Sequence, residues 1–178
     1  MKKYFLVILV LLLSSCSRKT DEQLFKEGQQ AQGQKDFLLA VDRYQELVDK
    51  YPKSSHADSA QFLTALIYNN DLREMEKAVK AYQQVYTKFP QSQMAPTAMF
   101  LVAFLFNNEL HQLDSARNLY YTFLQQYHTH ELAPSAKFEL ESLGKDPSQL
   151  ISQDVLAKVA TDSSKQEKTQ VIPKKKKR

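Results

Sequence analysis

Apolar residues recur along most of the chain at intervals of three or four positions, the spacing expected of helices with one apolar face. Ala40, Tyr44, Leu47 and Tyr51 form a stripe at i, i+4, i+7 and i+11, with mostly polar residues between them. Pro52 follows directly and ends the stripe, because a proline disfavours the helical conformation of the residue before it. The pattern therefore predicts an amphipathic helix that ends just before this proline.

The same stripe returns twice, each time 38 residues further along the chain. A constant offset at small, aromatic and branched positions is typical of internal repeats, in which stacked helical hairpins share one core. The recurring sets are Phe37, Met75 and Leu113; Ala40, Ala78 and Ala116; Tyr44, Tyr82 and Tyr120; Leu47, Val85 and Phe123; Tyr51, Phe89 and Tyr127; Phe62, Phe100 and Phe138.

Each striped helix, termed helix B, is expected to follow a first helix, termed helix A, within its unit. The predicted helices cover residues 21–32, 36–51, 56–69, 73–88, 94–107, 112–127 and 131–143. The expected capping pairs are Thr20 with Gln23 and Ser55 with Asp58. The asparagine pairs Asn69-Asn70 and Asn107-Asn108 are expected to end A helices by adopting left-handed conformations.

The repeat fades at the C-terminal end. Gly144 and Pro147 are expected to interrupt the helical pattern. In the next expected B helix, Asp154 and Lys158 stand at the positions where alanine and tyrosine recur in the earlier units. The apolar residues that remain predict a degenerate cap helix over residues 148–160. A solenoid needs such a cap because its last unit has no neighbour to cover its apolar face.

The N-terminus reads as an export signal. Lys2 and Lys3 precede an apolar run that ends at Leu13, and small residues follow, as in a secretory signal peptide. Ten apolar residues span only about 15 Å as a helix, half of a bilayer core, so a permanent membrane span is not expected. The last four residues of this segment, Leu13 to Cys16, resemble the bacterial lipobox, in which the cysteine is lipidated and becomes the mature N-terminus. The alternative is an ordinary secretory peptide with a chance cysteine.

Composition and charge change the picture at two points. The chain has three glycines, which favours helices over turn-rich β structure, and one cysteine, which leaves neither a disulfide framework nor a thiolate metal site. Residues 17–160 carry 15 Lys/Arg against 18 Asp/Glu, whereas residues 161–178 carry seven against two. The body is mildly acidic and only the tail is basic.

The tail, residues 161–178, is predicted to be disordered because it is polar and ends in a run of cations. That run is Lys174, Lys175, Lys176, Lys177 and Arg178. We expect it to touch anionic lipid or cell-wall polymer, at up to about 1 kcal/mol per cation near a membrane surface. The alternative is a solubilising tail without a partner. An exported chain gives no reason to expect a nucleic-acid partner.

The first unit resembles the tetratricopeptide repeat at its small, aromatic and proline positions, which are Gly28, Ala31, Phe37, Ala40, Tyr44 and Pro52. The long turns at residues 51–60 and 89–98 resemble those of periplasmic lipoproteins, the BamD type of outer-membrane assembly lipoprotein above all. The resemblance covers roughly residues 20–145. It implies an all-α, right-handed α-solenoid of antiparallel helix pairs. The BamD type is longer and typically has five repeats, so this chain departs from it in length.

The resemblance also implies a function and a place. We expect a lipoprotein on the periplasmic face of the bacterial outer membrane, where it binds other envelope proteins, including a β-barrel assembly complex, as a scaffold. The alternative is an envelope tether, or a repeat protein associated with Tol-Pal or the cell wall, that uses the basic tail. In this scheme residues 1–15 are the signal, 16–20 a lipidated linker and 21–160 the repeat domain. Its units are about 21–55, 56–93, 94–130 and a partial 131–160.

The partner is expected along the A helices, where an aromatic row can be aligned. If the small residues Gly28, Ala65 and Ala103 are equivalent, three phenylalanines project together and polar amides stand at the end of the row. The candidate binding residues are Phe25, Phe62, Leu66, Asn69, Phe100, Phe104 and Asn107. The alternative is that these rings are core residues, and a strict offset of 38 would pair Leu24 with Phe62 instead.

No constellation for catalysis or metal binding emerges. None of the four histidines, His56, His111, His128 and His130, lies at helical spacing from another ligand, and three scattered glycines cannot build a phosphate loop. His128 and His130 replace the proline turn of the earlier units and are expected on its surface. We expect no catalytic residue, no cofactor and no metal.

Overall fold

The protein is seen here in a computed structural model, which describes residues 18–145. The described residues up to Leu140 belong to one compact unit. The expected signal peptide, the lipidation at Cys16, the cap helix over residues 148–160 and the basic tail lie outside the described residues, so they stay predictions.

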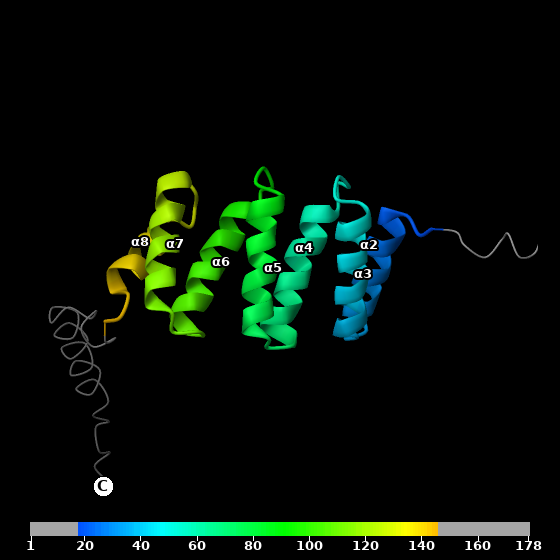
Figure 1. The fold of residues 1–178 in the computed structure, drawn as a ribbon, viewed down its shortest axis with the longest axis horizontal. Helices are drawn as coiled ribbons and strands as arrows, with labels where there is room; N and C mark the ends of the chain where they lie inside the picture. The colour runs from blue at the N-terminus through cyan, green and yellow to red at the C-terminus, as the bar shows by residue number, and fades with distance from the viewer. Residues whose placement is uncertain (1–17, 146–178) are drawn as a thin grey trace, which may run out of the picture. The chain divides into compact units, whose positions relative to one another are not determined.

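Every regular element in the range 18–145 is a helix (Figure 1). In chain order they are α2 (Asp21–Gly33), α3 (Phe37–Lys50), α4 (Ala57–Leu66) with the π-helix η1 (Ile67–Asp71), α5 (Met75–Lys88), α6 (Ala95–Asn108), α7 (Leu113–Gln126) and α8 (Ala133–Ser142). The predicted all-helical repeat is confirmed. The predicted helix ends lie within two residues of the observed ones, except where a π-helix extends α4.

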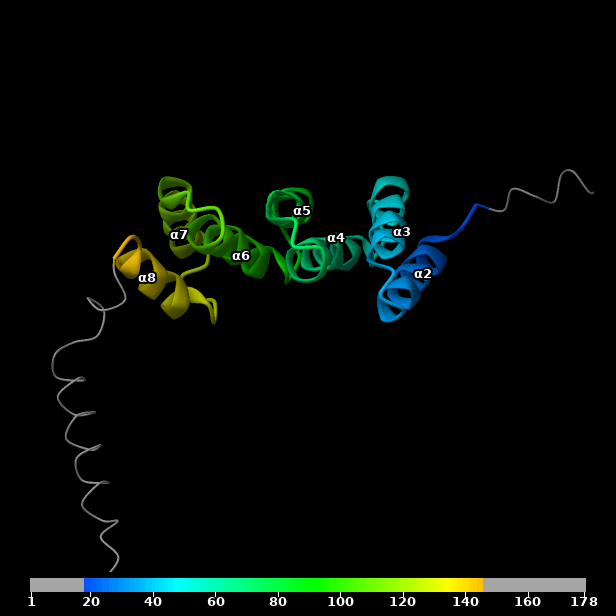
Figure 2. The ribbon, with the colours of Figure 1, turned by 90° about the horizontal axis from the view of Figure 1, so that it is seen from below.

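The helices form two rows (Figure 2). The A helices α2, α4 and α6 lie in one row and the B helices α3, α5 and α7 in the other, and each helix from α2 to α7 packs on the next in sequence. Two clusters of buried side chains lie between the rows, one around Tyr44 and one around Tyr82. The striped residues Tyr44, Tyr82 and Tyr120 are all inaccessible to solvent, so the repeated stripe is the core.

One predicted cap is confirmed and the other is wrong. Thr20 and Gln23 form a reciprocal capping box at the start of α2. Ser55 and Asp58 make no such pair: α4 begins after His56 without a side-chain cap. The serine one position earlier, Ser54, accepts a hydrogen bond from the backbone N–H of His56 instead.

Ser54 and the serine at the same position of the next unit, Ser92, each bind the long turn to the preceding A helix through a hydrogen bond. Ser54 Oγ donates to Asp21 Oδ2 over 2.6 Å, and Ser92 Oγ donates to Asp58 Oδ2 over 2.7 Å, one unit further on. Asp58 is thus held by the next turn through Oδ2, while its Oδ1 accepts a hydrogen bond from the N–H of Ser59 in its own helix. In the third turn His130 takes the serine position, and its Nδ1 accepts from the N–H of Leu132.

The expectation that asparagines end the A helices in left-handed conformations is wrong. α6 runs through both Asn107 and Asn108, and Asn69 and Asn70 lie within η1. The non-glycine residues with positive φ in the described part of the chain stand in the turns that follow, and they are Lys35 (62°), Arg73 (55°) and His111 (53°). These three are 38 residues apart, so the left-handed position belongs to the repeat geometry and not to asparagine propensity.

The first unit is one residue shorter than the others between its A and B helices. There the N–H of Asp36 bonds to the carbonyl of Ala31, five residues back. In the second unit the corresponding N–H of Glu74 bonds to Tyr68, six residues back, and η1 accommodates the extra residue. The first A helix is therefore offset from the second by 37 residues, while all later elements keep 38.

Candidate functional site

Small residues set the register of the A helices against the B helices, as expected. Gly28, Ala65 and Ala103 are all buried where A packs on B. A Cβ at Gly28 would lie 2.5 Å from Cε1 of the buried Tyr44 ring, so no larger residue fits without displacing that ring. These three positions are therefore structurally equivalent.

This register decides which phenylalanine belongs to the aromatic row. Leu24, Gln61 and Met99 are buried, whereas the residues that follow them, Phe25, Phe62 and Phe100, are half-buried. Leu24 therefore corresponds to Gln61 and not to Phe62. The three phenylalanines share one face of three successive A helices.

Each of these phenylalanines contacts the core tyrosine of its own unit. The distances between ring centroids are 5.8 Å for Phe25 and Tyr44, 5.5 Å for Phe62 and Tyr82, and 5.7 Å for Phe100 and Tyr120. Tilted and edge-to-face pairs at this separation are favourable arrangements of aromatic rings. Each phenylalanine thus packs partly on the core and keeps part of its surface accessible to solvent.

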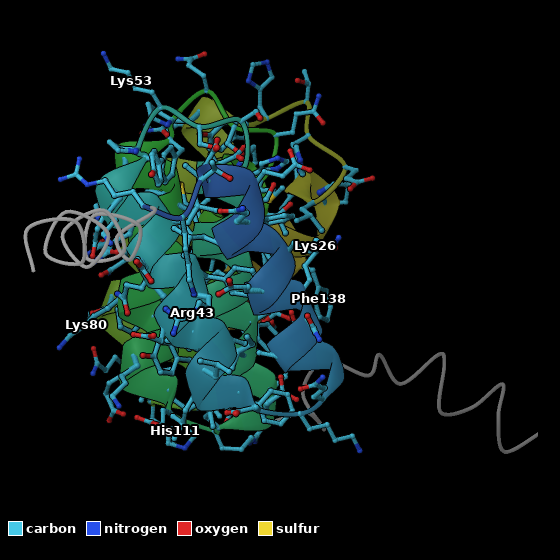
Figure 3. The ribbon with its side chains drawn as sticks, turned by 90° about the vertical axis from the view of Figure 1, so that its right-hand side faces the viewer. Lys26, Arg43, Lys53, Lys80, His111 and Phe138 are labelled. Atoms are coloured by element: carbon cyan, nitrogen blue, oxygen red, sulfur yellow. The ribbon has the colours of Figure 1, made fainter. Side chains whose placement is uncertain are left out.

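The row becomes more exposed toward α8. Leu66 is half-buried, whereas Phe104 is 36% exposed and stacks on Phe100 at 6.4 Å. Phe138 on α8 is 59% exposed, and Figure 3 places it on the same side as Lys26 of α2. The site prediction omitted Phe138, although it follows Phe100 at the repeat offset of 38. That spacing was the signal that could have found it.

The two predicted amides stand at half-buried positions at the ends of their A helices. Asn69 Nδ2 donates to Asn70 Oδ1 over 2.8 Å, and Asn107 Nδ2 donates to Glu139 Oε2 over 3.3 Å. The first unit has Gln32 at this register, and it accepts a hydrogen bond from the hydroxyl of Tyr44 over 3.1 Å. Asparagine is one methylene shorter than glutamine.

That difference leaves two buried hydroxyls without partners. The Oη atoms of Tyr82 and Tyr120 are buried and make no hydrogen bond with a described residue. Burial also raises the pKa of all three core tyrosines, that of Tyr44 to about 12. An unpaired buried hydroxyl costs free energy, so Tyr82 and Tyr120 lack a stabilising contact that Tyr44 has.

The histidines have structural contacts. His56 stacks on Phe25 at 4.6 Å, and His130 lies edge-on to Phe123 at 6.0 Å besides holding its turn. His128 is exposed, while His130 is half-buried. Within residues 18–145 no group of three or more His, Cys, Asp or Glu side chains is placed to hold a metal ion.

The remaining predicted site residues lie outside the described part of the chain. They are Cys16 and the tail cations Lys174, Lys175, Lys176, Lys177 and Arg178. Among the described helices, none is both long and apolar enough to cross a membrane.

Comparison with known proteins gives one family. A family model described as outer membrane lipoprotein, YfiO, matches residues 17–117. The match covers more than half of the chain and includes the units from α2 through the start of α7. A search of curated proteins found no match.

Proposed function

The chain belongs to the YfiO family of outer membrane lipoproteins, and from this premise we propose that it is a lipid-anchored scaffold that binds envelope proteins during outer-membrane protein assembly. The proposed anchor is a lipidated Cys16 after a signal peptide of residues 1–15, with the repeat domain facing the periplasm. Two or three acyl chains hold a protein stably, at about 0.8 kcal/mol per buried CH₂. We propose no catalytic role and no cofactor.

The observation that carries the scaffold role is the aromatic row on the A helices, formed by Phe25, Phe62, Phe100 and Phe104 and extended by Phe138. Exposed or half-exposed aromatic rings are frequent anchors in protein interfaces, because they bury much apolar area at a small entropic cost. Asn69 and Asn107 add amide groups that can hydrogen-bond a partner backbone. A partner segment laid along the row would contact successive units at equivalent points.

The binding test compares two exposed aromatic residues on opposite rows of helices. Phe104→Ala removes an aromatic side chain of the A row, and Tyr121→Ala removes one of α7 that is 58% exposed. We expect Phe104→Ala to reduce capture of envelope proteins from detergent-solubilised membranes while the melting temperature changes little. The control Tyr121→Ala should bind as the parent does. Equal binding by both variants would reject the A row as the site.

The anchor test is independent of the partner. Labelled palmitate should enter the parent chain and not the Cys16→Ala chain, because no other cysteine can accept it. Equal labelling of both chains would contradict the anchor. Deleting residues 161–178 then separates the scaffold from a tether, since a chain without its tail should still capture partners if the repeats do the binding.

A further inference from the structure

A small polar pocket lies on the opposite side of the unit from the aromatic row. Its volume is about 180 Å³. Gln45 of α3 lines one wall, Gln61, Thr64 and Tyr68 come from α4 and η1, and Lys77, Lys80, Ala81 and Gln84 come from α5. Figure 3 shows Lys80 on the side of the B helices, away from Lys26 and Phe138. Ligand pockets for whole small molecules usually measure about 300–1,000 Å³, so this one fits a side chain.

Two buried polar side chains form part of this pocket. Gln61 is 3% exposed and Thr64 is 2% exposed, and they are the buried polar side chains of the described core. Gln61 Nε2 donates to the carbonyl of Ala81 over 3.1 Å, and Thr64 Oγ1 donates to the carbonyl of Ala60 over 2.9 Å. The Gln61 amide also has a second N–H, which can donate to a bound acceptor.

The repeats supply an internal comparison. At the same register the next unit has Met99 for Gln61 and Val102 for Thr64, both buried and apolar. Leu119 likewise replaces Ala81 and packs into the core there. The fold therefore accommodates buried apolar residues at these positions, and the packing of the helices does not require the polar residues of the second unit.

The lining has cations and no acid. Lys77 pairs with Glu74 at 2.5 Å, which balances its charge, and lies over the ring of Tyr68 at 5.4 Å. Lys80 is exposed and makes no ion pair with a described residue. The Lys80 ammonium beside the amides of Gln45 and Gln84 provides donors for an anion, and charge-assisted hydrogen bonds are about twice as strong as neutral ones.

From these observations we propose that the pocket formed by Gln61, Thr64, Lys77 and Lys80 receives a carboxylate of a partner protein. The size of the pocket admits one acidic side chain or one chain terminus, and Lys80 supplies the complementary charge, with Lys77 beside it. This surface is separate from the aromatic row, so the scaffold has a second contact on its B-helix side. Acidic groups on a partner would be selected by the lysines and the buried amide together.

The test titrates the full mature chain in detergent with N-acetylglutamate amide, followed by amide NMR signals. Saturable shifts are expected at the side-chain amides of Gln61 and Gln84. N-acetylglutamine amide, which has the same shape without charge, should give none. N-acetylglycine distinguishes a terminal carboxylate from a side-chain one, and saturation by either acid supports the proposal. Equal shifts with the uncharged compound, or shifts spread over all surface lysines, would overturn it.

Two matched variants keep the test decisive. Gln61→Met with Thr64→Val installs the residues of the next unit, so the chain should fold at least as stably and lose the saturable shifts. Lys80→Gln should weaken binding about threefold or more, while Lys26→Gln on the opposite side should leave it unchanged. Undiminished binding in the first variant would overturn the proposal. The aromatic-row variant Phe104→Ala should not affect this titration, so the two sites can fail separately.

Discussion

At the scale of single residues, the contact between Gly28 and Tyr44 is the tightest constraint on the first unit. A methyl group at Gly28 would meet a ring that is fully buried and hydrogen-bonded through its hydroxyl, so the ring cannot move aside cheaply. Gly28→Ala should therefore lower the free energy of unfolding by about 1–3 kcal/mol. Gly33→Ala is the control, because nothing lies within 4 Å of its Cβ. Chemical denaturation should show no loss there.

The three core tyrosines differ in one hydrogen bond. Tyr44→Phe removes a hydroxyl that is paired with Gln32 and should cost about 1 kcal/mol of unfolding free energy. Tyr82→Phe removes a buried hydroxyl without a partner and should stabilise the chain by about 1 kcal/mol. Asn69→Gln should stabilise it as well, because the longer amide can reach Tyr82 as Gln32 reaches Tyr44. Equal effects of the two tyrosine changes would contradict this account.

At the scale of elements, the turns between A and B helices share a left-handed residue. This conformation costs an L-residue about 1–2 kcal/mol, and glycine adopts it without that cost. Glycine, however, loses more conformational entropy on folding, which destabilises the folded chain by about 0.5–1 kcal/mol. Arg73→Gly should therefore be neutral or stabilise by up to about 1 kcal/mol in thermal unfolding. A β-branched residue is worse there, so Arg73→Val should destabilise. A loss of stability in Arg73→Gly would show that the arginine side chain itself holds the turn.

The helices could be predicted from the sequence because two independent signals agreed. The alanine and tyrosine stripes set each B helix, and the prolines at residues 52 and 90 set where two of them end. The turn chemistry could not be predicted the same way. Asparagine propensity pointed to the wrong residues because the left-handed position is fixed by how A and B helices pack, a long-range effect. The bonds from Ser54 and Ser92 also join residues 33 and 34 positions apart.

The candidate site was predictable only in part, for the same reason. Small residues gave the correct alignment of Phe25 with Phe62, because Gly28 must admit the Tyr44 ring. The unpaired tyrosine hydroxyls arise because Asn69 and Asn107 stand where the first unit has the longer Gln32, and whether an amide reaches a buried hydroxyl depends on how the helices pack. The polar pocket could not be predicted either, because its residues come from different helices and the third unit, which has the same length, has apolar residues at the same register.

At the scale of the whole molecule, the proposed anchor limits how the repeats face the membrane. Asp21 is the fifth residue after Cys16, so their Cα atoms lie at most about 18 Å apart. The long turn at Ser54 is tied to this start of α2, and Tyr51 Oη donates to the carbonyl of Lys19 over 2.6 Å. The edge that carries Lys53 should therefore lie near the headgroups. Figure 3 shows His111 at the other edge, about 20 Å away along a helix of 14 residues.

This orientation can be measured with single labels, because lipidation would use the one native cysteine. A fluorophore at Lys53→Cys in the anchored chain should be quenched by lipids with a nitroxide headgroup, and a fluorophore at His111→Cys should be quenched far less. Equal quenching at both edges would rule out the orientation while leaving the anchor itself intact.

The central claim is that envelope proteins bind along the A helices, and site-specific crosslinking in living cells tests it most directly. A photoreactive phenylalanine analogue would replace Phe104 in the A row or Tyr121 on the B side, both of which tolerate a bulky exposed ring. The account predicts an adduct with an outer-membrane protein from position 104, in the membrane fraction, and none from position 121. Adducts from position 121 with none from position 104 would contradict it.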